Sequence, residues 1–581
     1  MKRSYYLLIF LSCTILSLLS CKKQSFLDKT ESTDLNEETV FADSTYAMNF
    51  LNGIYVNVGF SSSPTRFSTI YTTYPGLESA CDEAEGYVSG AGNTYIQFAT
   101  GTVSSTIVSK DAWQTPYTEI RAVNMLLKHL SKVPVTDGLK KKMKAEARFL
   151  RAWYYFILLE HYGGVPLVGD TLYTSSDVIP QSRNTFEECV NYIVAESDSA
   201  ANVLPWIQSG NDYGRANKAA CKALKARTLL YAASPLFNGG GIATTEPLKS
   251  ITGYPSYDKE RWKLAQDAAE EVIDPGKYSL YVDNATAPGY GFYEVFLLRE
   301  SSELIFAKMQ GDNKYLEGIW LPPSTNGTPI TFPYLEMANA FGMMNGLPIT
   351  DPASNYNPDD PYSNRDPRFN YSIIHDQTKV MRYPDLQRIA VNIYIDATDP
   401  NNVFSGLDAP HKGTLTGYYP FKMVDEDVDP IYFAYVTKRC MPLIRYAEIL
   451  LDYAEARNEY LDAPDQNVYD AVEAIRSRAG LNPYTLAVGL TQSEMRDIIR
   501  SERRVELAFE GHRFWDVRRW KIAPETDNVT LHGTEWTKTS SGMVSKTFDV
   551  RKHNFTDNMY LWPIPESEVS KSPELLQNPG Y

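Results

Sequence analysis

The sequence lacks an excess of positive charge, and this absence already disfavours one class of function. Its 581 residues include 56 Lys and Arg against 71 Asp and Glu, which gives a formal net charge of −15. A protein that binds nucleic acid needs a basic patch to neutralise the phosphate backbone. Since no long basic run offsets the acidic balance, we expect no nucleic-acid partner.

The sequence also has little cysteine and none of the usual catalytic signatures. Its six Cys residues are widely spaced, without a C-x-x-C pair, which disfavours a zinc ribbon. It contains no G-x-x-x-x-G-K-[ST] phosphate loop, no H-E-x-x-H helix and no G-x-S-x-G turn. Asp425, Asp427 and Asp429 alternate as calcium ligands do, but Pro430 stands where a calcium loop needs Gly, which favours a solvated acidic loop. We therefore expect no metal site and no cofactor.

The sharpest local signal that the sequence does contain is at its N-terminus. Two basic residues precede the apolar stretch Tyr5–Leu19, which is too short to span a bilayer comfortably and is typical of a secretory signal peptide. The stretch ends at Ser20-Cys21, a small residue followed by Cys, as in a bacterial lipobox. We therefore expect residues 1–20 to be removed and Cys21 to carry a lipid anchor. A plain signal peptide with an incidental Cys and an uncleaved anchor are the alternatives.

The largest part of the chain shows the period of amphipathic helices. Apolar residues recur at steps of three and four, and Gly or Pro ends many of the segments. Consecutive helices joined by short turns indicate helical hairpins, comparable to loose tetratricopeptide repeats of about 34 residues. The predicted helices span residues 115–133, 139–162, 185–204, 217–233, 258–273, 443–460, 468–479 and 490–521.

The middle of the chain has a composition typical of loops rather than of helices. Between residues 277 and 435, Gly, Pro, Asn and Asp recur every few positions, which predicts loops with short strands at 302–308 and 390–395. Long irregular segments in a folded chain often carry function.

We expect the chain to form one folded unit behind a signal peptide and a tether. The predicted bounds are 1–20 for the signal peptide, 21–36 for the lipidated tether, 37–581 for the unit, 110–275 and 440–521 for its helical scaffold, 60–110 and 277–435 for its irregular parts, and 522–581 for an extended tail.

The densest charged motif runs from Arg500 to Trp520. Glu502 and Glu506 lie one helical turn apart, and Arg503 and Arg513 can pair with carboxylates on either side. Because acids and bases are interleaved, the motif favours an ion-pair lattice between stacked helices over an anion-binding site.

A series of short motifs runs in order along nearly the whole chain. They are Phe26-Leu27-Asp28, Ala145–Ala152, Tyr162–Leu167, Gly214–Asn217, Arg365–Phe369, Arg445–Glu448, Ala454–Ala456, Arg500–Trp520 and Trp562–Pro565. Each alone is weak. In this order, behind a lipobox, they resemble the SusD/RagB family, the nutrient-binding outer-membrane lipoproteins of Bacteroidetes.

The resemblance implies a mostly α fold, in which tetratricopeptide-like helical hairpins pack against an irregular, loop-rich ligand-binding region with a few short strands. It implies a surface-exposed outer-membrane lipoprotein that captures an oligosaccharide, less often a peptide, without catalysis. It also implies a partner, a TonB-dependent transporter over which the protein sits as a lid. The motifs belong to the scaffold and do not mark the binding site. A secreted glycosidase and a pure protein-interaction scaffold remain as alternatives.

The chain has 40 Tyr against 24 Phe and 9 Trp, and the resemblance gives a reason to look for ligand-binding rings among polar residues outside the helical hairpins. Rigid rings suit the faces of sugars, and Asp, Asn and Glu suit their hydroxyls. Trp320 is the first candidate, because a large ring stands beside Pro322-Pro323 in a predicted loop; packing inside the irregular part is the alternative. The candidate ligand-binding residues are Tyr71, Tyr74, Asp82, Glu83, Asn93 and Tyr95 in one loop region, and Tyr290, Tyr293, Asn313, Tyr315, Trp320 and Asn326 in the other. In a glycosidase, Asp82 and Glu83 would be a candidate carboxylate pair, and an exposed acidic turn is the simpler interpretation.

Overall fold

The computed structural model describes residues 36–61, 76–87, 94–173, 182–399, 406–431 and 436–581. The predicted signal peptide, Cys21 and nearly all of the tether lie outside these ranges. Helices predominate in the described part and most strands are short, so the predicted mostly α fold is confirmed.

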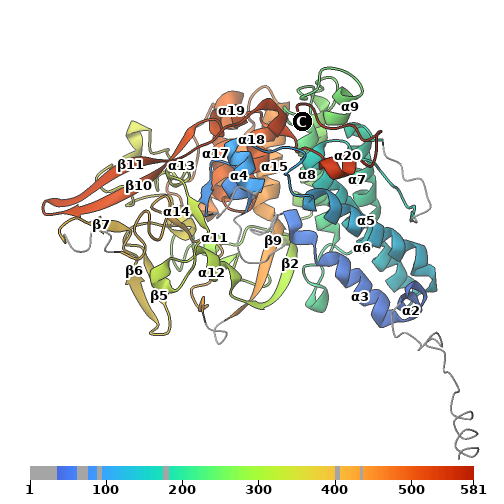
Figure 1. Ribbon diagram of the computed structural model, residues 1–581, viewed down its shortest axis with the longest axis horizontal. Helices are drawn as coiled ribbons and strands as arrows, with labels where there is room; N and C mark the ends of the chain where they lie inside the picture. The colour runs from blue at the N-terminus through green and yellow to red at the C-terminus, as the bar shows by residue number, and fades with distance from the viewer. Residues whose placement is uncertain (1–35, 62–75, 88–93, 174–181, 400–405, 432–435) are drawn as a thin grey trace, which may run out of the picture.

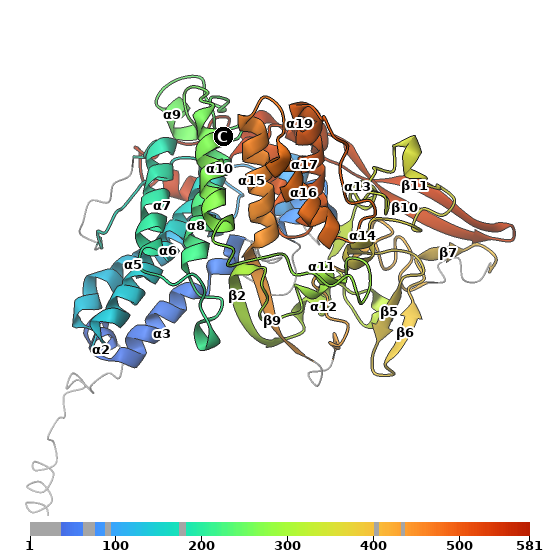
Figure 2. The same cartoon turned by 180° about the vertical axis from the view of Figure 1, so that it is seen from behind.

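The predicted helical scaffold is present as helices that pack on their successors. Helix α5 packs on α6, α6 on α7, α7 on α8, α8 on α10, α10 on α15, and α15 on both α16 and α17, as hairpin stacking requires (Figures 1 and 2). The bounds are α5 (Asp111–His129), α6 (Asp137–Tyr162), α7 (Phe186–Ala201), α8 (Lys218–Ala233), α10 (Glu260–Ile273), α15 (Tyr446–Tyr460), α16 (Gln466–Arg478), α17 (Gln492–Glu506) and α18 (Arg513–Arg519).

Helix α6 shows why the sequence predicts these elements well. The Thr136 hydroxyl accepts the N–H of Leu139 at 3.3 Å and so caps the first turn. At the other end Gly163 has a φ of 78°, a left-handed conformation that ends the helix. The predicted apolar stripe, including Leu150 and Ile157, is buried against the neighbouring helices.

The single helix predicted over residues 490–521 is wrong. The structure divides it into α17 and α18, because Phe509 and Gly511 adopt φ angles of 59° and 81°, which no right-handed helix contains. The Leu507 N–H still bonds to the Arg503 carbonyl at 3.0 Å before the chain turns. Because of this break, the charged residues of the motif lie on two separate helices rather than on one face of a single helix.

Shorter helices connect the scaffold to the rest of the chain. They are α2 (Glu37–Ala42), α3 (Ser44–Tyr55), α4 (Thr94–Thr100), α9 (Leu248–Thr252), α11 (Tyr290–Glu294), α12 (Tyr315–Trp320), α13 (Leu335–Ala340), α14 (Pro367–Ser372), α19 (Ala523–Thr526) and α20 (Glu566–Val569), with 3₁₀ turns at Val58–Ser61, Leu77–Ala80, Leu130–Lys132, Gly210–Asp212, Pro323–Thr325, Pro352–Ser354 and Asp557–Tyr560.

The strands form small separate sheets, in the orders β1-β3, β2-β9, β4-β8, β5-β6 and β11-β10-β7. The strand predicted at 302–308 is confirmed by β2, whereas the one predicted at 390–395 is divided between β6 and β7. The β10-β11 hairpin projects from the body in Figure 1. The bounds are β1 (Ala84–Gly86), β2 (Leu304–Asn313), β3 (Thr331–Pro333), β4 (Ile373–Ile374), β5 (Lys379–Arg382), β6 (Gln387–Ala390), β7 (Tyr394–Asp396), β8 (Tyr419–Pro420), β9 (Thr437–Arg445), β10 (Thr530–Thr539) and β11 (Gly542–Lys552).

Two large apolar cores fill the molecule, one among the scaffold helices and one in the irregular part. Buried charges lie between them: Glu506 pairs with Arg445 at 2.6 Å and Arg368 at 3.0 Å, and Arg503 pairs with Asp452 at 2.6 Å. The predicted ion-pair lattice is therefore confirmed, and it joins the end of α17 to both parts of the fold.

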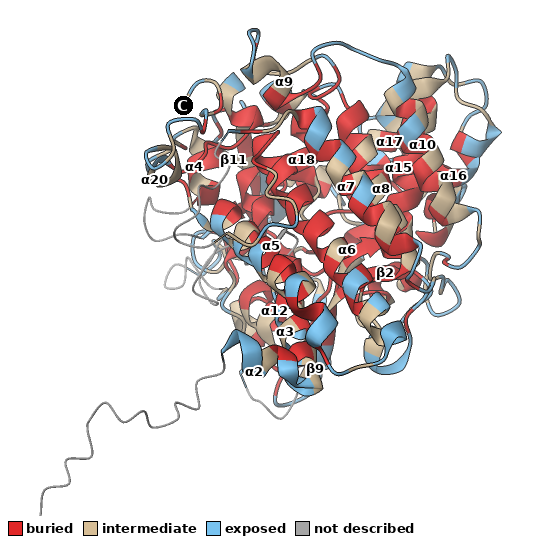
Figure 3. Cartoon of the chain, turned by 90° about the vertical axis from the view of Figure 1, so that its right-hand side faces the viewer, coloured by how far each residue is buried: buried red, intermediate tan, exposed pale blue. Residues whose placement is uncertain are grey.

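The C-terminal segment returns across the scaffold. Trp562 donates its backbone N–H to the carbonyl of His161 at 2.7 Å, and Arg183 bonds to the carbonyl of Leu576 at 2.9 Å. Figure 3 shows this segment and α20 beside α5, over helices whose inner faces are buried. The C-terminal segment thus forms one wall over helix α5.

Candidate functional site

The structure pairs the end of the first loop region with a segment that follows the second one. Strand β1 pairs antiparallel with β3, with Glu85 opposite Phe332. The ladder continues on both sides, because the Tyr87 N–H bonds to the Ile330 carbonyl at 2.8 Å and the Tyr334 N–H bonds to the Glu83 carbonyl at 3.0 Å. Residues some 250 positions apart in sequence therefore form one short, buried ladder.

An open groove of about 840 Å³ lies at the end of this two-stranded sheet. Its apolar wall consists of Ile, Pro, Phe and Leu side chains, and its polar groups come from Tyr, His, Lys and Thr. We call it the Tyr87 groove. It is lined by Tyr87, Ile319, Pro323, Gly327, Thr328, Pro329, Ile330, Phe332, His411, Lys412, Gly413, Thr414 and Leu415.

Two close backbone approaches fix the walls of the Tyr87 groove. A Cβ on Gly327 would lie 1.7 Å from the carbonyl oxygen of Leu321, and a Cβ on Gly413 would lie 2.3 Å from that of Leu407. Only glycine fits at such distances. The His411 N–H also bonds to the Thr414 carbonyl at 2.9 Å, which closes the turn on the opposite wall. The groove is therefore held by backbone contacts that need no ligand.

Tyr87 is the aromatic residue that the groove presents to solvent, with 56% of its surface exposed. The imidazole of His411 is also exposed, at 57% of the side chain, and its Nε2 lies 3.8 Å from Glu535. An exposed ring beside hydrogen-bonding groups can stack on a flat apolar face and bond the polar edge of the same ligand. The sequence candidates omit Tyr87, although it lies inside the first loop region, five residues after Asp82.

The structure places the other candidate residues elsewhere. Tyr71, Tyr74 and Asn93 lie outside the described residues. Trp320, Tyr293 and Tyr95 are buried, so their rings offer no open face. The remaining candidates are half-buried and none of them lines the Tyr87 groove: Tyr290, Asn313, Tyr315 and Asn326. The candidate residues that the structure describes in the two loop regions therefore do not form a common exposed patch.

Asp82 and Glu83 form part of a buried charge cluster behind β1. Asp82 pairs with Arg504 and Arg513, each at 2.8 Å, and is only 4% exposed. Burial opposes its ionisation, but the two guanidinium groups outweigh burial and hold the pKa of Asp82 well below its usual range. The exposed acidic turn suggested by the sequence is therefore wrong, because both carboxylates are buried.

The neighbouring carboxyls have the opposite shift. Burial raises the pKa of Glu78 to about 7. Burial, with the charges of Asp82 and Glu78, raises the pKa of Glu83 to about 8. Since an unfolded Glu titrates near pH 4.3, the folded protein keeps protons between about pH 4.5 and 8 that the unfolded chain has lost. Stability contributed by these groups therefore falls as the pH rises through this range.

We expect Glu83→Gln to remove part of this pH dependence. At pH 8 the variant should have a free energy of unfolding at least about 1 kcal/mol above that of the parent protein, and at pH 5 the difference should shrink. Urea denaturation at the two pH values measures the effect. The exposed Glu38→Gln change is the control; a Glu83→Gln profile parallel to that of the parent would contradict the prediction.

Neither a metal-binding cluster nor a membrane-spanning helix is found among the described residues. Nowhere in these ranges do three His, Cys, Asp or Glu side chains converge as metal ligands would. No helix among them is both long and apolar enough to cross a bilayer. The acidic loop that contains Asp427 and Asp429 is predicted to be solvated, and only part of it is. Asp427 is exposed, whereas Asp429 is buried and accepts the N–H of Ile431 at 2.8 Å.

Comparison with known proteins gives a consistent result along the chain. Residues 303–581 match the model described as SusD family, and residues 25–230 match the model described as starch-binding, associating with outer membrane. A SusD-like protein P2 from Formosa agariphila is 35% identical over 144 residues, which cover 24% of this chain and 25% of that protein. The SusD-like protein P38 of the same organism is 22% identical over 493 residues, covering 81% of this chain and 79% of P38.

A solved structure extends the likeness to the whole fold. The crystal structure of a SusD-like protein from Bacteroides fragilis superposes with a TM-score of 0.75 at 27% identity, covering 94% of this chain and 98% of that one. The two family models together span both the scaffold helices and the irregular part. From the order of its motifs, its helical hairpins and these matches, the chain belongs to the SusD family.

Proposed function

We propose that this chain is a glycan-binding lipoprotein that captures an oligosaccharide in the Tyr87 groove and passes it to a TonB-dependent transporter, over which it sits as a lid. The observation that carries the proposal is the exposed Tyr87 ring at a preformed groove of about 840 Å³. The match of residues 25–230 to a starch-binding, outer-membrane-associated model supports it. Anchorage through Cys21 is part of the proposal and lies outside the described residues.

The groove chemistry fits a sugar better than a purely apolar ligand. One wall is apolar, with Ile319, Pro329 and Phe332, and can contact C–H faces. His411 and Lys412 stand on the other wall and can bond hydroxyl groups. Ligand pockets commonly have volumes of about 300–1,000 Å³, so the groove accommodates a short oligosaccharide rather than one sugar.

The geometry gives little support to a glycoside hydrolase. Such an enzyme needs two carboxyl groups facing one bond, about 5–9.5 Å apart. Asp82 and Glu83 are buried behind β1, and Asp82 is committed to two arginines. Incubation with polysaccharides, followed by an assay for reducing ends, distinguishes the two functions, and released sugar would overturn the binding role.

A peptide ligand is the second candidate within the same site. It rests on the family resemblance, which implies a peptide less often than an oligosaccharide; all residues of β1 and β3 are buried and offer no exposed edge for an added strand. A glycan array run beside a peptide library separates the classes. Glycan binding without peptide binding is the expected result.

We expect Tyr87→Ala to weaken glycan binding about tenfold, because aromatic contacts of this kind contribute about 0.5–1.5 kcal/mol beyond area burial. Since the ring is largely exposed, the melting temperature should stay the same. Calorimetric titration with the best glycan from the array measures the affinity. Tyr257→Ala, at a Tyr that is 63% exposed elsewhere on the chain, is the matched control and should leave the affinity unchanged.

Binding by Tyr87→Ala with both the affinity and the stoichiometry of the parent protein would remove the groove from the proposal. Co-purification of the full-length lipoprotein with a transporter barrel tests the lid role separately. Absence of any stable barrel partner from membranes of the native organism would contradict that part of the proposal.

A further inference from the structure

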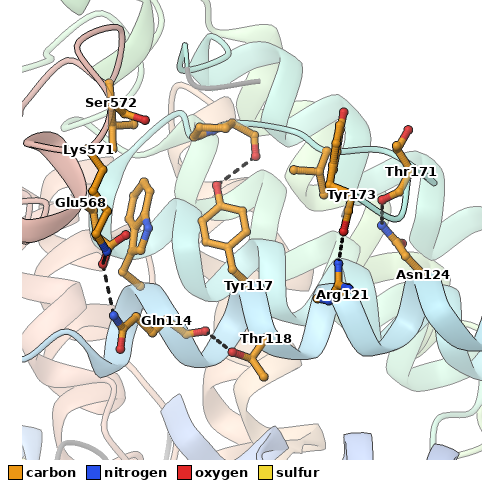
Figure 4. Close-up of a pocket in the computed structure, with 14 residues that line it drawn as sticks. Gln114, Tyr117, Thr118, Arg121, Asn124, Thr171, Tyr173, Glu568, Lys571 and Ser572 are labelled. Carbon is orange, nitrogen blue, oxygen red and sulfur yellow. Dashed lines mark hydrogen bonds and ion pairs between the residues drawn. The ribbon is translucent and has the colours of Figure 1, made fainter. Parts of the chain in front are cut away.

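A second pocket, of about 640 Å³, lies on the helical scaffold and shares no lining residue with the Tyr87 groove (Figure 4). Helix α5 forms its base. The segment that follows α6, residues 166–173, forms one wall, and the C-terminal segment around α20 forms the other. We call it the α5 pocket. Three segments distant in sequence build it, so it is a product of the tertiary fold rather than of one loop.

Aromatic rings form the centre of the α5 pocket. Trp113 and Tyr117 lie four residues apart and hence on one face of α5, with ring centroids 5.2 Å apart. The Tyr117 hydroxyl donates to the Pro166 carbonyl at 2.9 Å, which fixes the ring between helix and wall. Tyr173 stands half-buried on that wall. The rings are therefore held in place before any ligand arrives.

Planar hydrogen-bonding groups surround these rings. The Gln114 amide donates to Glu568 Oε1 at 3.1 Å, and Asn124 donates to the Thr171 carbonyl at 3.0 Å. Arg121 is exposed and donates one N–H to the carbonyl of Tyr173 (Figure 4). A guanidinium has five N–H donors, so it keeps donors for a further partner. These bonds tie the base to both walls.

The charge of the pocket favours a neutral ligand, because Lys571 pairs with Glu568 at 3.3 Å. Arg121 and Lys571 contribute two positive charges and Glu568 one negative charge, which leaves a small net charge. Such a balance suits a neutral ligand with many hydroxyls better than a polyanion. Carboxylate, amide and guanidinium groups each offer paired atoms that match adjacent hydroxyls on one ring.

We propose that the α5 pocket is a second oligosaccharide-binding site. The proposal rests on the proposed function only for the class of ligand, since its residues and walls are independent of the Tyr87 groove. The volume lies within the usual range for a small ligand, about 300–1,000 Å³, and corresponds to a short neutral oligosaccharide. A polysaccharide chain held at both sites would bind with an avidity that neither site provides alone.

The experiment begins with an array of neutral and uronic-acid oligosaccharides, including maltotriose and laminaritriose, probed with the full chain. The best trisaccharide is then titrated by calorimetry into the parent protein, Tyr87→Ala, Arg121→Ala and Tyr173→Ala. We expect Tyr87→Ala to retain binding at one site. Adding Arg121→Ala or Tyr173→Ala to it should weaken that remaining binding at least about tenfold. Tyr87→Ala with Tyr257→Ala is the matched control and should retain it.

The outcomes separate the two proposals. If no glycan binds the parent protein, the proposed function fails and the α5 pocket with it. If Tyr87→Ala alone abolishes binding, the groove is supported and the second site is overturned. Binding by Tyr87→Ala that Arg121→Ala and Tyr173→Ala leave unchanged also overturns the second site. Should the Tyr87→Ala protein bind peptides or uronic acids through Arg121 and no neutral glycan, the ligand class is overturned. Equal melting temperatures of all variants exclude misfolding as the cause of any loss.

Discussion

Replacing Glu506 by glutamine will lower the free energy of unfolding by about 3–5 kcal/mol, the cost of leaving buried charges without their partner. The carboxylate is fully buried and accepts from Arg445 at 2.6 Å, from Arg368 at 3.0 Å and from Arg478. A neutral amide of the same shape keeps the packing but leaves these three guanidinium groups short of one negative charge. Removal of one member therefore costs far more than a lost surface ion pair.

The same contacts predict the response to acid. Burial opposes ionisation of Glu506, but Arg478, Arg445 and Arg368 outweigh it and hold the pKa of Glu506 well below its usual range. Its stabilising effect is fully present above about pH 4.3, where the unfolded carboxyl titrates, and is lost as the pH falls towards the lowered value. The parent protein should therefore lose stability below that pH more steeply than Glu506→Gln.

Urea denaturation at pH 7 and pH 4 measures both effects. The control is Asp267→Asn, which breaks the exposed pair between Asp267 and Lys263 on α10 and should change the free energy of unfolding by at most about 0.5 kcal/mol. Unfolding of Glu506→Gln at the same urea concentration as Asp267→Asn would contradict the view that the lattice joins the two parts of the fold.

The sequence predicts the scaffold well because its signals are local. The cap at Thr136, the stop at Gly163 and the apolar stripe between them all lie within one helix, and α6 begins two residues before the predicted start. The error at residues 490–521 has the opposite cause. Phe509 takes a positive φ that its own sequence does not favour, so the break depends on contacts made elsewhere.

The candidate site is less predictable because burial depends on distant partners. Asp82 looks like part of an exposed acidic turn, yet its partner Arg513 lies 431 residues further along the chain. Tyr87 could have been found as a ring within the first loop region, but no local pattern separates it from Tyr95, which is buried. Residue type therefore suggests a ligand class to test, but it does not predict which rings are exposed in the folded chain.

The buried position of Trp320 leads to the second large expected effect. Trp320→Ala should lower the free energy of unfolding by about 3–5 kcal/mol, the usual cost of removing a large buried ring and leaving a cavity. The side chain has no exposed surface and packs in the core of the irregular part, with its ring centroid 6.3 Å from that of Phe509. It belongs to the same apolar core as Ile319 and Phe332, which line the Tyr87 groove, so the ring helps to hold that wall.

Loss of glycan binding in Trp320→Ala should therefore accompany a lower melting temperature. Trp320→Phe distinguishes a packing role of the ring from direct contact with the ligand. Within the described part of the chain the indole Nε1 has no hydrogen-bond partner, so phenylalanine loses volume but no hydrogen bond. We expect Trp320→Phe to keep most of the stability and nearly all of the affinity, and the exposed control Tyr257→Ala to change neither. Calorimetric titration beside thermal unfolding measures both quantities. If Trp320→Ala lost affinity at an unchanged melting temperature, the ring would contact the ligand itself, and the groove would have to open as far as the core behind β3.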